Sequence, residues 1–275
     1  MIQLGLIGYP LGHSLSPKIH TAALVASGLE GHYSLLPISP EDKQGLKDLL
    51  ARVRTGEITG LNVTIPHKQN VIELMNELTV TAKAIGAVNT IYLRNGKLVG
   101  DNTDALGFLS DLKKFIGNRE LGVGNRKSAA VLGAGGSARA VVYALLNDGW
   151  EVTLVARRFE RAEQLASSFT KYQLQVADFS SFITHHSSLI VNTTPLGMTP
   201  NIEASPLPEN ITLSPNTIIY DLVYNPRETK LVRDARAQGL SATTGLGMLI
   251  EQAALAFEKW TGVNADRAAM QQAVA

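Results

Sequence analysis

The sequence predicts an α/β protein of two domains, and three observations carry this prediction. The chain has 275 residues, which is more than one small hydrophobic core needs. Short apolar runs typical of buried strands alternate with stretches whose apolar side chains recur at helical spacing, a pattern that favours mostly parallel sheets. A polar, glycine-containing stretch at 118–126 interrupts this alternation, and we interpret it as a loop between two units.

The first unit opens with the apolar run Ile2–Gly8, which we expect to form a buried strand. Ser16 followed by Pro17 predicts a helix start, because a serine hydroxyl can cap a helix and proline suits its first turn. Ser39 and Pro40 repeat this pattern ahead of a segment that places several leucines on one helical face.

Three more strands are expected in this unit, at 58–64, 88–93 and 97–100. Asn95 and Gly96 lie between the last two strands and favour the tight turn of a hairpin. The first sheet is therefore predicted to be mostly parallel, with one antiparallel hairpin.

The second unit contains six strand candidates, at 128–132, 151–156, 173–177, 188–192, 217–221 and 240–243. Helical patterns at 138–146 and 246–260 follow the first and the last of them. Six strands with helices between them are typical of a doubly wound, Rossmann-type dinucleotide-binding domain.

A glycine-rich turn joins the strand at 128–132 to the helix after it. Its residues are Gly133, Ala134, Gly135, Gly136, Ser137 and Ala138, which have the spacing of the dinucleotide fingerprint. The first glycine permits a tight turn, the second lets the backbone approach a pyrophosphate, and the alanine allows close packing of helix and strand. Because the first N–H groups of a helix have no partner within it, they can bind phosphate. The turn therefore predicts a nucleotide site.

The end of the following strand indicates which nucleotide is bound. Domains that bind NAD place an acidic residue there, which accepts a hydrogen bond from the ribose 2′-hydroxyl. Here Ala156 is followed by Arg157 and Arg158, with Arg161 one helical turn further on. Guanidinium groups pair with phosphate in fork geometry, so we predict NADP, held at its 2′-phosphate. The alternative is a solvated basic helix start, since Glu160 lies nearby.

Unusual loops follow the last three strands, at 192–198, 221–226 and 244–248. Each loop alone could be ordinary turn chemistry, but ligands of α/β sheets bind at the carboxyl ends of strands, and three such loops share that edge. Thr193 in the first loop and Met248 in the third are candidate cofactor contacts, with the methionine packing on the nicotinamide.

Hydroxyl and amide side chains gather in the first unit. Ser14 and Ser16 place two hydroxyls at a helix start, which suits a carboxylate. Asn62 and Thr64 alternate along a strand and therefore point to one side, with Lys68 just beyond them.

Further polar groups follow at the next strand and hairpin. Asn89 is expected in a buried strand, where its side-chain amide needs a hydrogen-bond partner. Asp101 or Thr103 is expected to cap the next helix, which contains Asp104. A lone lysine is usually a solvated surface charge, but a strand end crowded with amides, hydroxyls, a lysine and an aspartate suits a polyhydroxylated carboxylic acid.

Composition excludes several function classes. The net charge of +1 gives no strong attraction to nucleic acid or to an anionic membrane. The chain has no cysteine, which excludes disulfides, thiolate nucleophiles and cysteine-based zinc sites, and we expect no metal. No segment reaches the ~20 apolar residues of a membrane helix, and no secretory signal is expected. We therefore expect a cytoplasmic monomer or homodimer that binds small molecules.

Eight of these stretches resemble, in the same order, motifs of the shikimate dehydrogenase family. They are 8–17, 60–68, 86–90, 100–108, 133–138, 192–198, 221–226 and 245–252. Eight ordered motifs are far more specific than any one of them. The resemblance implies reversible oxidation of shikimate to 3-dehydroshikimate by NADP, with the reduction serving the chorismate pathway to aromatic amino acids.

The resemblance also implies roles for particular residues. Lys68 and Asp104 would be the catalytic pair, with Lys68 exchanging the proton of the reacting hydroxyl. How the two divide the proton transfer stays open. Ser14 and Ser16 would hold the substrate carboxylate. The remaining substrate contacts would be Asn62, Thr64, Asn89, Tyr224 and Gln252, and the nicotinamide end of the cofactor would lie along Leu222 and Gly245.

The expected layout has a discontinuous first domain, residues 1–103 and 245–275, which binds substrate, and a second domain, 104–244, which binds NADP. Two features depart from the usual family pattern. An Asn-Arg-Thr or Asn-Arg-Ser run is replaced by Ala156-Arg157-Arg158, and His67 stands where relatives often have an aromatic or aliphatic residue, so we expect His67 to pack.

Three other functions stay open at this point. They are a quinate/shikimate dehydrogenase that prefers NAD, a non-catalytic nucleotide sensor, and a reductase for another carbonyl metabolite. An acid at position 156 would favour the first of these, and loss of Lys68 or Asp104 would favour the second. The third would not need the pair of serines.

Overall fold

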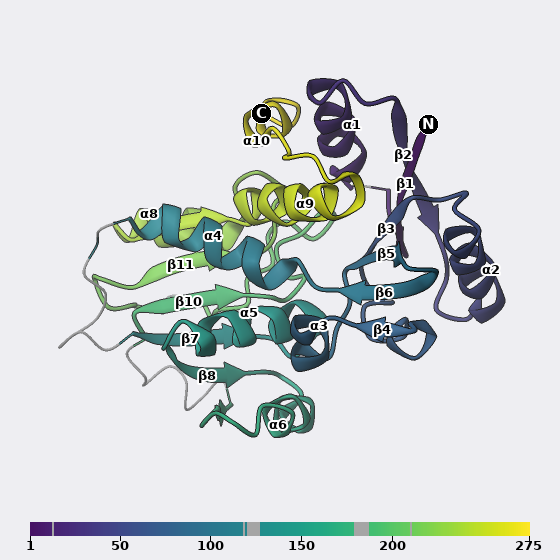
Figure 1. Cartoon of the computed structure of the whole chain (residues 1–275). Helices are drawn as coiled ribbons and strands as arrows, with labels where there is room; N and C mark the ends of the chain where they lie inside the picture. The colour runs from purple at the N-terminus through teal and green to yellow at the C-terminus, as the bar shows by residue number, and fades with distance from the viewer. Residues whose placement is uncertain (13, 118, 120–126, 179–186, 210) are drawn as a thin grey trace. The chain divides into compact units, whose positions relative to one another are not determined.

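A computed structural model describes residues 1–12, 14–117, 119, 127–178, 187–209 and 211–275, and it confirms the predicted α/β fold (Figure 1). Apart from position 119, the loop expected at 118–126 lies outside the described residues. The chain divides into two compact units, Met1–Gly107 with Leu249–Ala275, and Phe108–Met248. Both divisions fall within helices, α4 (Asp104–Ile116) and α9 (Leu246–Thr261). Each lies four residues beyond the boundary expected from the sequence.

The first unit holds a six-stranded sheet in the order β2-β1-β3-β5-β6-β4. Its strands are β1 (Ile2–Gly8), β2 (Gly31–Pro37), β3 (Gly60–Val63), β4 (Glu77–Leu78), β5 (Thr90–Arg94) and β6 (Lys97–Asp101). Strand β5 runs antiparallel to β3 and β6, and the other pairings are parallel. The predicted hairpin is present, with Asn95 at φ 52° and Gly96 at φ 74° in its turn.

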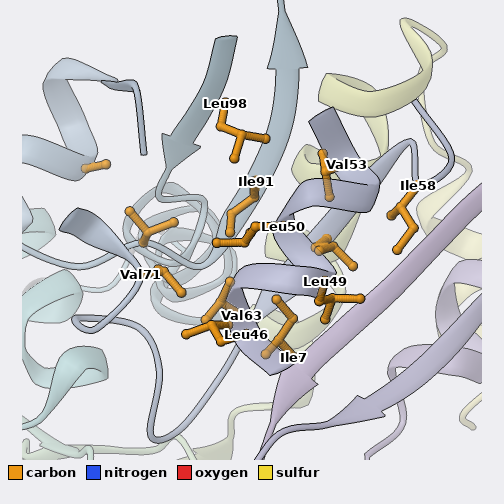
Figure 2. Close-up of a cluster of buried hydrophobic side chains, with 13 residues drawn as sticks. Ile7, Leu46, Leu49, Leu50, Val53, Ile58, Val63, Val71, Ile91 and Leu98 are labelled. Carbon is orange, nitrogen blue, oxygen red and sulfur yellow. The ribbon is translucent and has the colours of Figure 1, made fainter. Parts of the chain in front are cut away.

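The helices of the first unit, besides its parts of α4 and α9, are α1 (Ser16–Ala26), α2 (Lys43–Arg54), α3 (Val80–Ile85), α10 (Arg267–Gln272) and the short 3₁₀ helix Ile72–Leu74. Helix α2 buries its apolar face against one side of the sheet (Figure 2). Leu46, Leu49, Leu50 and Val53 meet strand residues such as Leu61 there. Each such side chain stabilises the fold by about 1.5–3 kcal/mol relative to exposure.

An aromatic cluster of His20, Tyr33 and Trp260 lies in the same unit. The rings of His20 and Tyr33 stack at 4.3 Å with 2° between their planes, and the ring of Trp260 lies 5.3 Å from that of His20. Gly60 permits this arrangement, because a β-carbon there would lie 2.1 Å from the Trp260 ring. The Trp260 Nε1–H donates to the Ile91 carbonyl at 3.0 Å, which fastens α9 to β5.

The helix starts differ from the expectation in which side chains cap them. Helix α1 begins at Ser16, but Ser16 does not cap it. The hydroxyl of Ser14 instead accepts a hydrogen bond from the Ser16 N–H at 3.2 Å. Helix α2 begins after Asp42 rather than Ser39, and the Asp42 carboxylate accepts from the Gly45 N–H at 2.8 Å. A carboxylate interacts more favourably with the helix dipole than a hydroxyl does, so the aspartate sets the start.

The second unit holds a six-stranded sheet in the order β12-β11-β10-β7-β8-β9, with every neighbouring pair parallel. Its strands are β7 (Ser128–Leu132), β8 (Glu151–Val155), β9 (Gln175–Ala177), β10 (Leu189–Asn192), β11 (Ile218–Asp221) and β12 (Ser241–Thr244). This is the strand order of a doubly wound Rossmann domain, the fold that the sequence predicts for this unit.

Helices α5 (Gly136–Asn147), α6 (Phe159–Ser167) and α8 (Lys230–Ala237) belong to the second unit. Leu231, Val232 and Ala235 of α8 join a buried cluster with side chains of β7, β10 and β11. Phe108 of α4 meets the ring of Tyr220 edge-on at 5.1 Å, and both side chains are fully buried. No described helix combines the length and apolarity that crossing a bilayer would require.

The buried imidazole of His20 predicts a loss of stability in acid. Burial lowers the pKa of His20 from 6.5 to about 3, so between these values the unfolded chain binds a proton that the folded chain excludes. Stability is therefore lost as the pH falls through this window. We expect His20→Phe, which keeps a flat ring against Tyr33, to reduce that loss between about pH 7 and pH 5, measured by urea unfolding. Replacing the exposed His32 with glutamine is the matched control. Parallel pH profiles of wild type and His20→Phe would contradict the prediction.

Candidate active site

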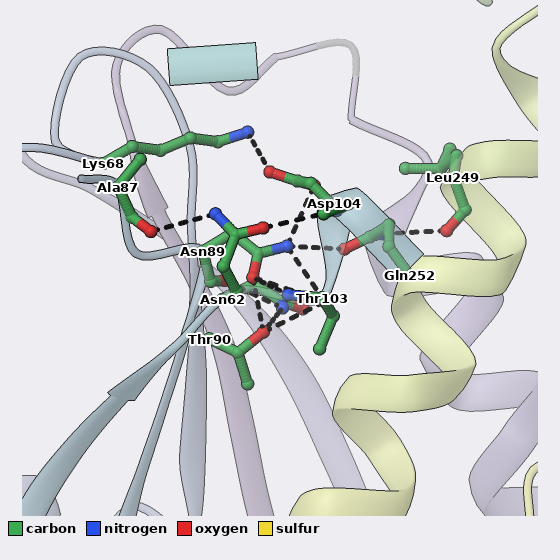
Figure 3. A network of polar contacts seen from close by, with 11 residues as sticks. Asn62, Lys68, Ala87, Asn89, Thr90, Thr103, Asp104, Leu249 and Gln252 are labelled. Carbon is green, nitrogen blue, oxygen red and sulfur yellow. Dashed lines mark hydrogen bonds and ion pairs between the residues drawn. The ribbon is translucent and has the colours of Figure 1, made fainter. Parts of the chain in front are cut away.

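Lys68 and Asp104 meet in the first unit. The Lys68 Nζ lies 2.8 Å from Asp104 Oδ2, and the two side chains are only 11% and 7% exposed (Figure 3). Shielding from water strengthens the attraction between opposite charges. The main chain at Lys68 is fixed because its carbonyl accepts from the Val88 N–H at 2.8 Å. Asp104 is the first residue of α4, where the helix dipole favours a carboxylate.

The side-chain amide of Asn89 binds the other carboxylate oxygen of Asp104. The Asn89 Nδ2 lies 2.9 Å from Asp104 Oδ1, 3.0 Å from the hydroxyl of Thr103 and 3.3 Å from Gln252 Oε1. The Asn89 Oδ1 accepts from the Thr103 N–H at 2.8 Å and from the Thr90 hydroxyl at 2.9 Å. Asn89 is 2% exposed. The aspartate is therefore held at both carboxylate oxygens, by an ammonium group on one side and an amide on the other.

Gln252 reaches this network from α9 because α4 and α9 approach each other closely there. A β-carbon on Gly107 of α4 would lie 2.7 Å from the backbone nitrogen of Gln252, so no larger residue fits. The Gln252 Nε2 also donates to the Leu249 carbonyl at 2.8 Å, which orients the amide. Sequence reasoning missed Gly107. Its signal was a glycine inside an apolar helix pattern, a destabilising choice that calls for a packing reason.

Asn62 lies beside Asn89 at the carboxyl end of β3 and is 5% exposed. Its Nδ2 donates to the Asn89 carbonyl at 3.2 Å and to the Thr90 hydroxyl at 3.4 Å. Its Oδ1 accepts from the Tyr33 hydroxyl at 2.8 Å. Thr64 is half-buried just beyond the strand. Sequence reasoning also missed Tyr33, because strand β2 was not predicted.

The two serines have a local structural role. Ser16 is buried and Ser14 half-buried, and the hydroxyl of Ser14 orients the first turn of α1 through its bond to the Ser16 N–H. This bond uses an acceptor of Ser14, so its hydroxyl hydrogen can still be donated. Among the described residues, no hydrogen bond joins the serines to the Asn89 network.

The side chains expected to cap α4 lie elsewhere. The Ala105 N–H donates to Asn102 Oδ1 at 3.3 Å, so Asn102 acts in their place. Asp101 forms an ion pair with Lys259 at 3.2 Å, and Thr103 belongs to the Asn89 network. Thr103 therefore occupies the predicted N-cap position directly before Asp104, but neither its side chain nor that of Asp101 is the capping group. Both side chains bind partners that are distant in sequence, which a local pattern cannot show. The neighbouring His67 is buried, and its Nε2–H donates to the Ile38 carbonyl at 2.7 Å.

The predicted nucleotide turn lies at the start of α5 in the second unit. Gly133 has φ 112°, which few other residues adopt, and a β-carbon there would lie 2.7 Å from the Thr193 hydroxyl. Gly135 precedes the helix without a capping side chain, and a β-carbon there would meet nothing within 4 Å. Ala138 is fully buried against the sheet. Ala134 lies in the turn, and Gly136 and Ser137 are the first two residues of α5. The first N–H groups of α5 thus fit a pyrophosphate.

Three arginines follow β8. Arg157 and Arg158 stand before α6, Arg158 at its N-cap position, and Arg161 lies in its first turn. All three are exposed, and within the described part of the chain none forms an ion pair or a side-chain hydrogen bond. Their donors are therefore available for a phosphate group, which fits the 2′-phosphate of NADP. Among the described residues, no group of three or more His, Asp or Glu side chains is placed to hold a metal ion.

Two of the loops at this sheet edge are joined by Asp221, which is fully buried at the end of β11. Its carboxylate accepts from the Asn192 Nδ2 at 2.8 Å, the Val223 N–H at 3.0 Å and the Thr229 hydroxyl at 2.6 Å. Burial raises the pKa of Asp221 to about 6, while these bonds oppose the shift. For Asp221 and Asn192 the structure thus shows a role in holding the loops together.

The remaining predicted contacts lie nearby in the second unit. Gly245 packs on the main chain after β11, because a β-carbon there would lie 2.3 Å from the Leu222 carbonyl oxygen. The Thr193 hydroxyl donates to the Leu132 carbonyl at 2.7 Å. Met248 is 7% exposed. Tyr224 is half-buried, and burial raises the pKa of its hydroxyl.

Comparisons with known proteins cover nearly the whole chain. A family profile described as the shikimate dehydrogenase substrate binding domain matches residues 6–91. A profile described as shikimate / quinate 5-dehydrogenase matches 116–228, and one described as the shikimate 5′-dehydrogenase C-terminal domain matches 245–275.

Individual relatives agree with these profiles. The chain is 41% identical to the shikimate dehydrogenase (NADP(+)) of Salinibacter ruber, over 98% of this chain and 95% of that protein. A structure of shikimate 5-dehydrogenase from Thermus thermophilus, in complex with NADP(H) and shikimate, is 38% identical, with a TM-score of 0.87 over 99% of this chain and 98% of that one. Quinate dehydrogenase from Corynebacterium glutamicum, in complex with NAD, is 32% identical, with a TM-score of 0.88 over 99% and 98%.

Proposed function

The chain belongs to the shikimate dehydrogenase family, and from this premise we propose that Lys68 and Asp104 are the catalytic pair of an enzyme that interconverts shikimate and 3-dehydroshikimate with NADP. The observation that carries the proposal is the shielded contact of 2.8 Å between Lys68 Nζ and Asp104 Oδ2, in a cluster of amides and hydroxyls. We assign the substrate to the first unit and NADP to the second.

Lys68 and Asp104 carry out the proton transfer of the reaction. Oxidation of an alcohol removes a hydride from carbon and a proton from oxygen, and NADP, when bound, takes the hydride. In the reduction, the Lys68 ammonium that pairs with Asp104 donates a proton to the carbonyl oxygen, and in the oxidation the deprotonated amine accepts the hydroxyl proton. Asp104 stabilises the positive charge that develops on Lys68. Asn89 keeps the aspartate in place through its other oxygen, at 2.9 Å.

The substrate binds through hydroxyl and amide groups around this pair. Ser14 and Ser16 hold the carboxylate at the start of α1, where the hydroxyl of Ser14 retains a hydrogen to donate. The resemblance assigns further contacts with the substrate hydroxyls or carboxylate to Asn62, Thr64, Asn89, Tyr224 and Gln252. Amides suit polyols because each offers both a donor and an acceptor.

NADP binds along the carboxyl edge of the second sheet. The N-terminus of α5 would hold its pyrophosphate, and Arg157, Arg158 and Arg161 would hold its 2′-phosphate. The remaining contacts are Gly133, Ala134, Gly135, Gly136, Ser137, Thr193, Leu222, Gly245 and Met248. The open space beside Gly135 and the available arginine donors support this assignment.

Preference for NADP over NAD is the first consequence to test. Because the second strand is followed by Ala156 and arginines, we expect NADP to be used at least about tenfold better than NAD. Replacing Arg157 and Arg158 together with alanine should raise the KM for NADP much more than that for NAD, since only NADP loses charge-assisted hydrogen bonds. Spectrophotometric assays of shikimate and of quinate with both cofactors measure this. Arg233→Ala, which removes an exposed arginine of the same unit, is the control.

Equal catalytic efficiency with NAD and NADP in the wild type would refute the cofactor assignment. Turnover of quinate with NAD above that of shikimate with NADP would favour the quinate dehydrogenase function instead.

Loss of Lys68 should abolish proton exchange with little effect on binding. We expect Lys68→Ala to lower turnover by roughly 10²- to 10⁴-fold, the scale of a lost acid–base group. Affinity for shikimate should change far less. Lys68→Arg should fail as well, because a guanidinium stays protonated near neutral pH. Steady-state turnover assays and calorimetric binding of shikimate measure these effects, with circular dichroism to confirm folding.

Lys83→Ala, which removes an exposed lysine from α3 of the same unit, is the matched control and should keep full turnover. If Lys68→Ala retains turnover while only the KM for shikimate rises, Lys68 is a binding residue and Asp104 becomes the first candidate for the proton acceptor.

A further inference from the structure

Tyr33 is the one buried residue of β2, and its hydroxyl reaches the substrate site. Strand β2 lies at the edge of the first sheet, with β1 between it and β3. Tyr33 pairs with Leu4 of β1, and Leu4 pairs with Gly60 of β3, two residues before Asn62. The side chain of Tyr33 therefore crosses β1 to donate its hydroxyl to Asn62 Oδ1 at 2.8 Å.

The ring of Tyr33 is held by the aromatic cluster. The imidazole of His20 covers it in a parallel stack at 4.3 Å, and Trp260 lies against His20. Burial lowers the pKa of His20 to about 3, so the imidazole is neutral near neutral pH and packs as an uncharged ring. With both neighbours buried, the ring has little freedom, and the direction of its hydroxyl is set by packing.

The Tyr33 hydroxyl favours one of the two orientations that the side-chain amide of Asn62 can take. The two ends of a side-chain amide have nearly the same shape, yet one only accepts hydrogen bonds and the other only donates them. With Oδ1 of Asn62 facing the Tyr33 hydroxyl, its Nδ2 faces the Asn89 carbonyl and the Thr90 hydroxyl. The reversed amide would set two carbonyl oxygens, those of Asn62 and Asn89, against each other.

We propose that Tyr33 is a positioning residue of the substrate site, which fixes the amide orientation of Asn62 before the substrate arrives. This inference rests on the proposed function, in which Asn62 belongs to the shikimate site. A group that is oriented in advance loses less freedom on binding, so the hydroxyl of Tyr33 contributes to affinity without touching the substrate.

Tyr33→Phe tests the proposal, because it removes the hydroxyl and keeps the ring against His20. We expect the Kd and the KM for shikimate to rise roughly 3- to 10-fold, the scale of one lost hydrogen bond. Turnover and the KM for NADP should stay within about twofold, since the lysine–aspartate pair and the nucleotide site are unchanged. Tyr172→Phe is the matched control. It removes the same kind of bond, from the Tyr172 hydroxyl to Asn147 Oδ1 at 2.9 Å, in the second unit, and should change neither constant.

A double-mutant cycle shows whether Tyr33 acts through Asn62. If it does, Tyr33→Phe adds no further change in shikimate affinity once Asn62→Ala is present. Equal effects of Tyr33→Phe in both backgrounds would overturn the proposal. A Tyr33→Phe enzyme that melts at a lower temperature but binds shikimate as the wild type does would also overturn the proposal. If Asn62→Ala does not fold, the shikimate affinity of Tyr33→Phe alone decides the test. A wild-type chain that does not turn over shikimate would overturn the proposed function, and this inference with it.

Discussion

The arrangement of the candidate active site depends on the buried amide of Asn89. Its nitrogen and oxygen join Thr90 at the start of β5, Thr103 and Asp104 at the start of α4, which are 14 and 15 residues away, and Gln252 on α9, which is 163 residues away. A buried polar group left without a partner costs about 1–3 kcal/mol, so each member of such a network requires the others to be in place. The position of Asp104, and with it that of Lys68, follows from this requirement.

Two glycines let the same network be built into the core. Gly107 allows α4 to lie against α9 at Gln252, and Gly60 allows Trp260 of α9 to lie on the sheet. Helix α9 is thus fixed at two positions, Gln252 and Trp260, and the residue that faces each of them has no room for a side chain. Packing and polar contacts therefore fix the same parts of the first unit, in which the proposed substrate site lies. Tyr33 belongs to both, with its ring in the core and its hydroxyl at the site.

Most of the fold could be predicted because its strands are buried apolar runs bounded by turns. Strands β1 and β7 have the predicted bounds. Strand β2 escaped prediction because it is an edge strand with a single buried residue, and so has no alternating pattern. The charge pair is a different case. Its members lie 36 residues apart with no periodic relation, so only the resemblance to a family identified them. The capping side chains of α1 and α2 were misassigned because local rules rank capping residues but do not decide between neighbours, as Asp42 and Ser39 show.

The polar atoms of Asn89 are all engaged within the protein itself. A ligand hydroxyl that arrives there exchanges one hydrogen bond for another, and the net gain in free energy is small. An analogue that lacks this hydroxyl leaves the existing hydrogen bonds intact, and no buried polar group loses its partner. Such a site discriminates weakly against deoxygenated analogues, in contrast to sites whose polar groups wait unpaired for their ligand. Selectivity among cyclic polyols would then fall to the shape of the site and to the carboxylate contacts proposed for Ser14 and Ser16.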